Sequence, residues 1–155
     1  MLNKRTFGGV IAVVLIAAFA SILGVQAAMA ATTSTCYHVH GTLRTQVVAA
    51  GETRGTITQG GPLNGTTQDQ ITSFNSSTGT YTALFQDTTE NGTLATRDNG
   101  QFSPNGPFVE NGVVDGSAST GGFVGATGSL TFSGSTPDGI HFTATVTGVI
   151  CKISL

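Results

Sequence analysis

Hydrophobic and polar residues alternate with a period of two over most of the chain beyond residue 35. A strand places successive side chains on opposite faces, so this alternation predicts strands with one apolar and one polar face. No part of this region shows the period of about 3.6 residues that marks an amphipathic helix. We expect eight strands, over residues 36–48, 53–59, 66–74, 80–87, 93–98, 108–118, 129–133 and 141–151.

Turn-forming residues separate these segments at short intervals. Gly60-Gly61-Pro62, Asn75-Ser76-Ser77, Asn91-Gly92 and Asn99-Gly100 are examples, and such short loops favour antiparallel neighbours joined by hairpins. Many short strands with this spacing are typical of an all-β barrel or sandwich. No internal repeat or linker divides residues 31–155, so we expect a single all-β domain there.

The first thirty residues follow a different pattern. Lys4 and Arg5 precede an uncharged apolar run over residues 8–25, and Ala28-Met29-Ala30 matches the small-residue site that signal peptidase cleaves. An uncleaved anchor is the competing interpretation, because about 18 apolar residues can just span a bilayer. The cleavage site directly after the run favours removal. We expect residues 1–30 to be a signal peptide, cut after Ala30 or next to it after Ala31, and the remainder to be secreted, with the periplasm and the cell surface as the other destinations of an exported chain.

Two cysteines, Cys36 and Cys151, lie near the two ends of the exported chain. A reactive or metal-binding role is one alternative, but no CxxC motif accompanies either residue, and in an oxidising compartment such a pair forms one disulfide. Each cysteine falls on the polar face of its strand. If the first and last strands pair antiparallel, both sulfurs project from the same side of the sheet. A bond there ties the first strand to the last, as barrel closure requires. We therefore expect an eight-stranded antiparallel β-barrel with a Cys36–Cys151 disulfide on its outer face.

Charge is scarce in this chain. Charged residues make up 9% of it, against a norm of about 25%, and there are 22 glycines and no tryptophan. Beyond residue 30, four basic and eight acidic side chains leave a net charge of about −4. A nucleic-acid surface needs clustered Lys and Arg, so we expect no nucleic-acid partner. We also expect no cofactor, and no membrane attachment once the signal peptide is removed.

A glycine-rich passage carries a family resemblance. Residues 121–134 read Gly-Gly-Phe-Val-Gly-Ala-Thr-Gly-Ser-Leu-Thr-Phe-Ser-Gly, and this Gly-x-Phe-x-Gly-x-x-Gly run entering a late strand resembles the corresponding element of the allene oxide cyclase and dirigent barrel superfamily. Residues 61–66 and 145–151 resemble small secreted bacterial members of that group. The resemblance covers most of residues 36–151 and implies an eight-stranded barrel with an apolar central cavity. The plant members cyclise an epoxide or steer radical coupling by holding a substrate in shape, but none of their catalytic motifs matches this chain.

The three histidines of the chain are candidate metal ligands. His38 and His40 share one strand face about 7 Å apart, a spacing seen in metal sites. A tight zinc site needs a third ligand. Pairing of the two cysteines would place His141 opposite residue 46, far along the strand. We therefore expect solvated histidines on a polar face and no metal site.

Two carboxylates are weak candidates for catalytic groups. Asp87 follows Tyr81 and Phe85 with the same parity, and Glu110 follows Phe108 two positions on. If those apolar faces line the barrel interior, both acids lie near its mouth with raised pKa values. The competing interpretation, which the sequence favours, ends the strands there and leaves both acids in water.

The more apolar face of each strand is expected to point into the barrel, since burial of one such side chain is worth about 1.5–3 kcal/mol. The interior of an eight-stranded barrel is filled by side chains or holds one small ligand. We expect a secreted module that binds a small apolar molecule or serves another non-catalytic extracellular role, and the alternative is a cyclase or isomerase acting by control of substrate shape. The expected cavity-lining residues are Tyr37, Val39, Leu43, Tyr81, Phe85, Phe108, Phe142, Val146 and Ile150.

Overall fold

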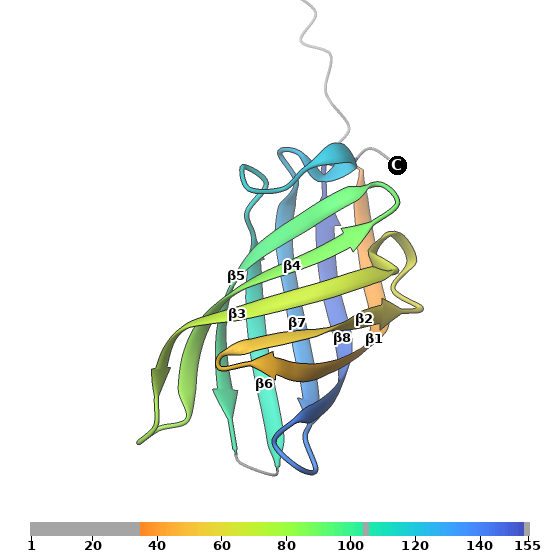
Figure 1. Ribbon diagram of the computed structural model, residues 1–155. Helices are drawn as coiled ribbons and strands as arrows, with labels where there is room; N and C mark the ends of the chain where they lie inside the picture. Colours follow the sequence, from red (N-terminus) through yellow and green to blue (C-terminus); the bar gives the residue numbers. More distant parts are fainter. Residues whose placement is uncertain (1–34, 104–105, 154–155) are drawn as a thin grey trace, which may run out of the picture. The chain divides into compact units, whose positions relative to one another are not determined.

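Eight strands close into one antiparallel barrel (Figure 1). The computed structural model of the protein describes residues 35–103 and 106–153, so the expected signal peptide lies outside the described residues. Neighbouring strands are hydrogen-bonded in sequence order, and the last pairs with the first. The predicted fold class is confirmed. The strands are β1 (Cys36–Ala49), β2 (Glu52–Thr58), β3 (Gly65–Asn75), β4 (Thr80–Thr89), β5 (Gly92–Phe102), β6 (Pro107–Val114), β7 (Thr127–Ser135) and β8 (His141–Cys151).

The largest differences from the predicted strand boundaries are at the ends of β5 and β6. Asn99-Gly100 was expected to form a loop, but β5 continues to Phe102, with Gly100 paired to Tyr81 of β4 and to Glu110 of β6. The strand expected over residues 108–118 ends at Val114. It ends there because the carboxylate of Asp115 accepts hydrogen bonds from the backbone N–H groups of residues 117 and 118 and so holds a tight turn.

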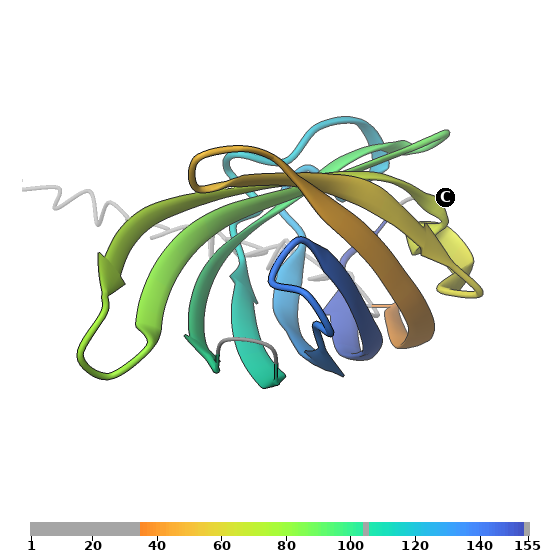
Figure 2. The same ribbon diagram turned by 60° about the horizontal axis from the view of Figure 1, so that its bottom comes forward.

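The two ends of the barrel are built differently. The turns of the hairpins β1–β2, β3–β4 and β7–β8 lie at the same end of the antiparallel barrel, and Figure 2 brings the β7–β8 turn forward. We call this end the open end. The opposite end, which we call the closed end, carries the connections between β2 and β3 and between β6 and β7, each with one 3-10 helix, η1 (Gly61–Leu63) and η2 (Gly121–Phe123), and η2 is at the top of Figure 1. Within the described ranges, no helix has the length and hydrophobicity needed to cross a membrane.

The closed end is a solid hydrophobic core. Leu63 of η1 and Phe123 of η2 are both 0% exposed and pack among buried residues of the strands. Gly121 allows the η2 connection to fit closely over the β4–β5 turn, since it has a φ of +58° and a Cβ there would lie 2.3 Å from the carbonyl oxygen of Asn91. The glycine-rich run therefore covers the closed end and places Phe123 in its core. The strand residues of the core include Val39, Ile57, Leu94, Leu130, Val146 and Ile150.

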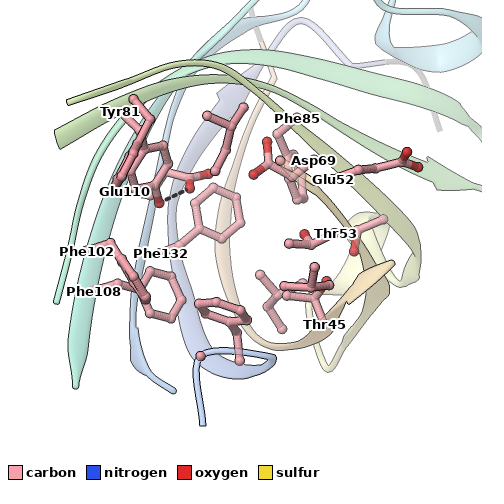
Figure 3. A pocket seen from close by; sticks show the side chains of 18 residues that line it. Thr45, Glu52, Thr53, Asp69, Tyr81, Phe85, Phe102, Phe108, Glu110 and Phe132 are labelled. Atoms are coloured by element: carbon pink, nitrogen blue, oxygen red, sulfur yellow. Dashed lines mark hydrogen bonds between the residues drawn. The ribbon is translucent and has the colours of Figure 1, made fainter. Parts of the chain in front are cut away.

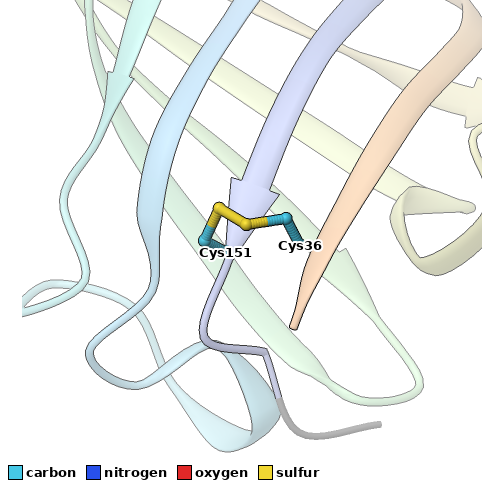
Figure 4. Close-up of a disulfide and its surroundings, with 2 residues drawn as sticks. All are labelled: Cys36 and Cys151. Atoms are coloured by element: carbon cyan, nitrogen blue, oxygen red, sulfur yellow. A yellow bond between two sulfur atoms is a disulfide. The ribbon is translucent and has the colours of Figure 1, made fainter. Parts of the chain in front are cut away.

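The disulfide joins the first and last strands at the closed end (Figure 4). Cys36 and Cys151 lie directly opposite one another in the β1–β8 register, with their Cα atoms 3.9 Å apart. That distance is within the limit of about 7 Å for a bridge and slightly below the usual range. Val39 and Ile150, which have the opposite parity to the cysteines, are buried inside the barrel. The bond is therefore on the outer face, as expected.

Removing the disulfide should destabilise the barrel strongly. The cysteines are 115 residues apart, and a bridge that closes so long a loop stabilises the folded state by up to about 4–5 kcal/mol in the chain-entropy model. The double variant Cys36→Ala/Cys151→Ala should lose a free energy of unfolding of that order in urea denaturation. Addition of a reductant should destabilise the parent protein and leave the double variant unchanged. An equal effect of reductant on both proteins would contradict this role.

Candidate functional site

A cavity of about 340 Å³ occupies the half of the barrel toward the open end (Figure 3). Its size falls in the range of about 300–1,000 Å³ found for small-molecule sites. Aromatic rings pack against one another along its wall: the centroids of Phe85 and Phe132 are 4.9 Å apart, and those of Phe108 and Phe142 are 5.6 Å apart. The aromatic side chains lining the cavity are Phe74, Tyr81, Phe85, Phe102, Phe108, Phe132 and Phe142.

The lining of the cavity reaches the protein surface at the open end. Val47 of β1 and Phe74 of β3 are 38% and 52% exposed, and both line the cavity. Val48 and Ile140, at the neighbouring turns, are also more than 40% exposed. Apolar side chains therefore surround the mouth as well as the interior, which suits the entry of an apolar molecule.

Polar groups gather on one part of the wall. Glu110 of β6 and Asp69 of β3 line the cavity, and the Tyr81 hydroxyl donates a hydrogen bond of 2.5 Å to Oε2 of Glu110. Figure 3 shows this pair joined by a dashed line, with Asp69 beside Phe85. Asp98 of β5 is 2% exposed and lies in the same group, although it does not line the cavity. Three carboxyl groups and one phenol thus meet inside the barrel.

Two glycines make room for this group. Tyr81, Gly100 and Glu110 are opposite one another on three adjacent strands. A Cβ at Gly100 would lie 2.1 Å from Cζ of Tyr81, so the missing side chain lets the ring cross β5 and reach Glu110. Gly112 is paired with Asp98 in the same way, and its Cβ would lie 2.6 Å from Oδ1 of Asp98. Gly100 is therefore needed for the close approach of the Tyr81 ring, and not for the turn that Asn99-Gly100 suggested.

Burial changes the acidity of these groups. It raises the pKa of Asp98 to about 9, and the adjacent Glu110 carboxyl adds to this effect. Burial followed by the negative charge of Glu110 raises the pKa of Asp69 to about 8. The same two causes raise the pKa of Tyr81 far above its usual range. Neither carboxylate oxygen of Asp98 has a hydrogen-bond partner of good geometry, so Glu110 acts on it mainly by proximity.

No basic side chain compensates these acids within residues 35–103 and 106–153. Arg97 and His141 contact the carboxylates of Asp115 and Asp138 on the outer face, and the exposed Arg54 pairs with Glu52, which lines the cavity. His38 and His40 are exposed on β1. In the same ranges no three or more His, Cys, Asp or Glu side chains are grouped so as to hold a metal ion. Asp69 and Asp98 therefore depend on protonation to avoid unpaired charge.

The two candidate carboxylates are both buried, so their expected placement in water is wrong. Asp87 is 0% exposed and Glu110 is 6% exposed, because β4 continues past Asp87 to Thr89 and β6 begins before Glu110. Glu110 lines the cavity and Asp87 does not. Asp87 lies two residues beyond Phe85 toward the closed end, where burial alone raises its pKa to about 7.

The expected cavity-lining residues divide into two groups. Leu43, Tyr81, Phe85, Phe108 and Phe142 line the cavity. The others face inward but belong to the core of the closed end, so their assignment to the cavity is corrected. Leu63 and Phe123 enter from the two loops and fill that end, and alternation within strands cannot predict this. The corrected residues are Tyr37, Val39, Val146 and Ile150.

Asp69 and Asp98 were missed by the sequence analysis. Asp69 lies in a stretch of β3 that is polar on both faces, and only its shared parity with Ile71 marks it as inward-facing. Asp98 was placed at the end of its strand, beside the supposed Asn99-Gly100 loop. Its shared parity with Leu94, which is 0% exposed, was the signal that could have found it.

Comparisons with known proteins add no relative: the chain matches no protein-family model, no curated protein and no solved structure. The resemblance of residues 121–134 to allene oxide cyclase and dirigent barrels therefore rests on those residues alone. The cavity is the feature of the barrel that bears on its function.

The free energy of unfolding should fall as the pH rises from about 4 to about 9. Asp98 and Asp69 have folded-state pKa values of about 9 and about 8, against an ordinary value of 3.8, so the unfolded chain releases protons that the folded barrel retains. The stabilising contribution is complete below the unfolded value and is lost as the pH passes the folded values. Asp98→Asn should reduce the loss by at least about 1.4 kcal/mol, the equivalent of one pKa unit.

Urea denaturation at about pH 5 and about pH 9 measures this loss. Glu90→Gln is the matched control, because Glu90 is an exposed carboxylate beside the β4–β5 turn. The control should keep the full pH dependence of the parent protein. Equal slopes for Asp98→Asn and Glu90→Gln would show that Asp98 does not hold a proton in the folded barrel.

Tyr81 should resist ionisation. Tyr37→Phe leaves Tyr81 as the single tyrosine, because the chain has two tyrosines. In this variant the phenolate absorbance should appear only well above pH 10, since burial and the charge of Glu110 both oppose ionisation. Adding Glu110→Gln should lower the midpoint. A midpoint near 10 in the single variant would contradict the Tyr81–Glu110 contact.

Proposed function

We propose that this protein is a secreted β-barrel module that binds a small apolar molecule in the cavity at its open end. The observation that carries this proposal is the aromatic-walled cavity of about 340 Å³, whose lining reaches the surface at Val47 and Phe74. Burial of an apolar ligand against such a wall is worth about 25 cal/mol for each Å² removed from water. This free energy of burial is gained only when an apolar ligand fills the cavity.

The distribution of polar groups indicates the shape of the ligand. Phe102, Phe108 and Phe142 form the apolar side of the cavity near the mouth, while Glu110 and Asp69 offer oxygen atoms to it. Small-molecule sites commonly combine a largely apolar lining with a few polar groups that orient the ligand. The ligand therefore has an apolar body with a polar group at one end.

Secretion is supported by two independent features of the chain. The disulfide is consistent with an oxidising extracellular compartment. The order of charge, apolar run and small-residue site in residues 4–30 is that of a cleaved signal peptide. We propose export with cleavage after Ala30 and a small apolar molecule as the partner, with no nucleic acid or membrane involved after cleavage.

A cyclase or isomerase of the allene oxide cyclase and dirigent kind is the second candidate. It is favoured by the position of Glu110, which places a carboxyl group and the Tyr81 phenol in an apolar cavity. Acidic groups in apolar surroundings can donate or accept a proton during a rearrangement. In such an enzyme the aromatic wall would hold the substrate in shape, and Glu110 would act on its polar end.

A neutral apolar fluorophore, N-phenyl-1-naphthylamine, tests the binding function. Its fluorescence should rise on addition of the protein and saturate at about one probe per barrel. Thr45→Phe should weaken binding at least about tenfold, because Thr45 lines the cavity and a ring there would fill it. Thr145→Phe is the matched control on the outer face, where Thr145 is exposed. Equal binding by both variants would place the probe outside the cavity and contradict the proposal.

Mass spectrometry of molecules extracted from the secreted protein distinguishes the two candidates. A binding module should release the molecule it carries unchanged after incubation. An enzyme should convert it into an isomer of the same mass and different retention time, and Glu110→Gln or Tyr81→Phe should slow that conversion. Recovery of an unaltered ligand from the parent protein would exclude the cyclase or isomerase function.

A further inference from the structure

The polar part of the cavity contains carboxyl groups whose oxygens lack hydrogen-bond partners. Asp98 is 2% exposed, and both of its carboxylate oxygens lack a hydrogen-bond partner. Oδ1 of Asp69 is also buried without a partner, and Asp69 lines the cavity. A buried polar group without a partner costs about 1–3 kcal/mol. Unpaired acceptors from β3 and β5 thus lie beside Glu110 of β6, whose Oε2 is already bonded to Tyr81.

The protein itself brings no cation to these acids. Arg44, Arg54 and Arg97, which alternate with inward-facing residues on their strands, are exposed on the outer face, as is Lys152. The described residues also lack a grouping of acidic, histidine or cysteine side chains that fits a metal ion. A positive charge for this site would therefore come from an organic molecule that enters through the open end.

We propose that the ligand of this cavity is an apolar amine, and that Asp69 and Glu110 bind its ammonium group, with the carboxyl group of Asp98 directly behind them. This inference rests on the proposed binding function and specifies the class of ligand. An ammonium group has three donors and no acceptor, which matches carboxyl groups supplied by several strands once these release the protons that they hold in the empty barrel. Charge-assisted hydrogen bonds of this kind are about twice as strong as neutral ones.

The aromatic wall suits the same ligand. Phe85 and Phe132 pack together beside Asp69, and Tyr81 covers Glu110. The faces of aromatic rings attract cations by about 0.5–2 kcal/mol when the site is desolvated. The apolar body of the amine would lie against Phe102, Phe108 and Phe142 toward the mouth. A carboxylate ligand would instead add a further negative charge beside these acids, and the Tyr81 hydroxyl already donates its hydrogen bond to Glu110.

Three probes with the same apolar chain test the proposal: n-octylamine, 1-octanol and octanoate. Isothermal titration calorimetry with the folded, disulfide-bonded protein at about pH 7.5 should show n-octylamine binding at least about tenfold more tightly than 1-octanol. Octanoate should bind most weakly. Asp98→Asn should reduce the ratio of amine to alcohol affinity at least about fivefold, and Asp69→Asn provides a second variant if the first fails to fold. Glu90→Gln, which removes an exposed carboxylate, should leave the ratio unchanged.

The outcomes separate this inference from the function on which it rests. If n-octylamine and 1-octanol bind equally and Thr45→Phe abolishes both, the proposal of an amine ligand is overturned. The proposal of a cavity for an apolar ligand then stands. Amine binding that persists in Thr45→Phe, or falls equally in Glu90→Gln and Asp98→Asn, would be attraction to the acidic surface and would also overturn the proposal of an amine ligand. Binding of no probe, including the neutral fluorophore, would overturn both proposals.

Discussion

Closure of the barrel between β1 and β8 determines which residues are inside. The two strands pair continuously from Cys36 opposite Cys151 to Gln46 opposite His141. A slip of one residue in any strand pair would turn every side chain of that strand to the other face. In a closed ring each strand is paired on both sides, so such a slip would have to break two sets of hydrogen bonds. The inward-facing acids are therefore held inside by the register of the whole barrel.

The two halves of the barrel bury their acids differently. The closed end is filled by side chains from the strands and by Leu63 and Phe123 from the loops. It packs around the single buried carboxyl of Asp87 and carries the disulfide. The open end retains a cavity with three carboxyl groups at its wall or directly behind it. Sites of this kind, which break the rule that buried polar groups are paired, are the usual places to look for function.

The sequence predicted the fold well because the alternation of side chains has a simple physical origin. Period-two patterns located the eight strands, and the shared parity of Cys36 and Cys151 predicted their bond and the closure of the barrel. The candidate site was predicted only in part. Glu110 was identified, but Asp98 was missed because Asn99-Gly100 has the composition of a turn. The structure explains this exception, since Gly100 is required beneath the Tyr81 ring and not at a turn. The extent of the cavity could not be predicted, because it depends on how deeply Phe123 enters from a loop.

Infrared spectroscopy of the folded protein at about pH 7 tests the protonation of the buried acids most directly. Protonated carboxyl groups give a C=O stretching band separate from that of carboxylates. The pKa values of Asp69 and Asp98 are raised to about 8 and about 9, so both side chains should be protonated in the folded protein at pH 7. The folded protein should therefore show this band at a pH where an unfolded chain has lost it. The band should weaken in Asp98→Asn and remain in Glu90→Gln. A folded protein at pH 7 with no protonated carboxyl band would contradict the claim that the barrel holds acids without an internal cation.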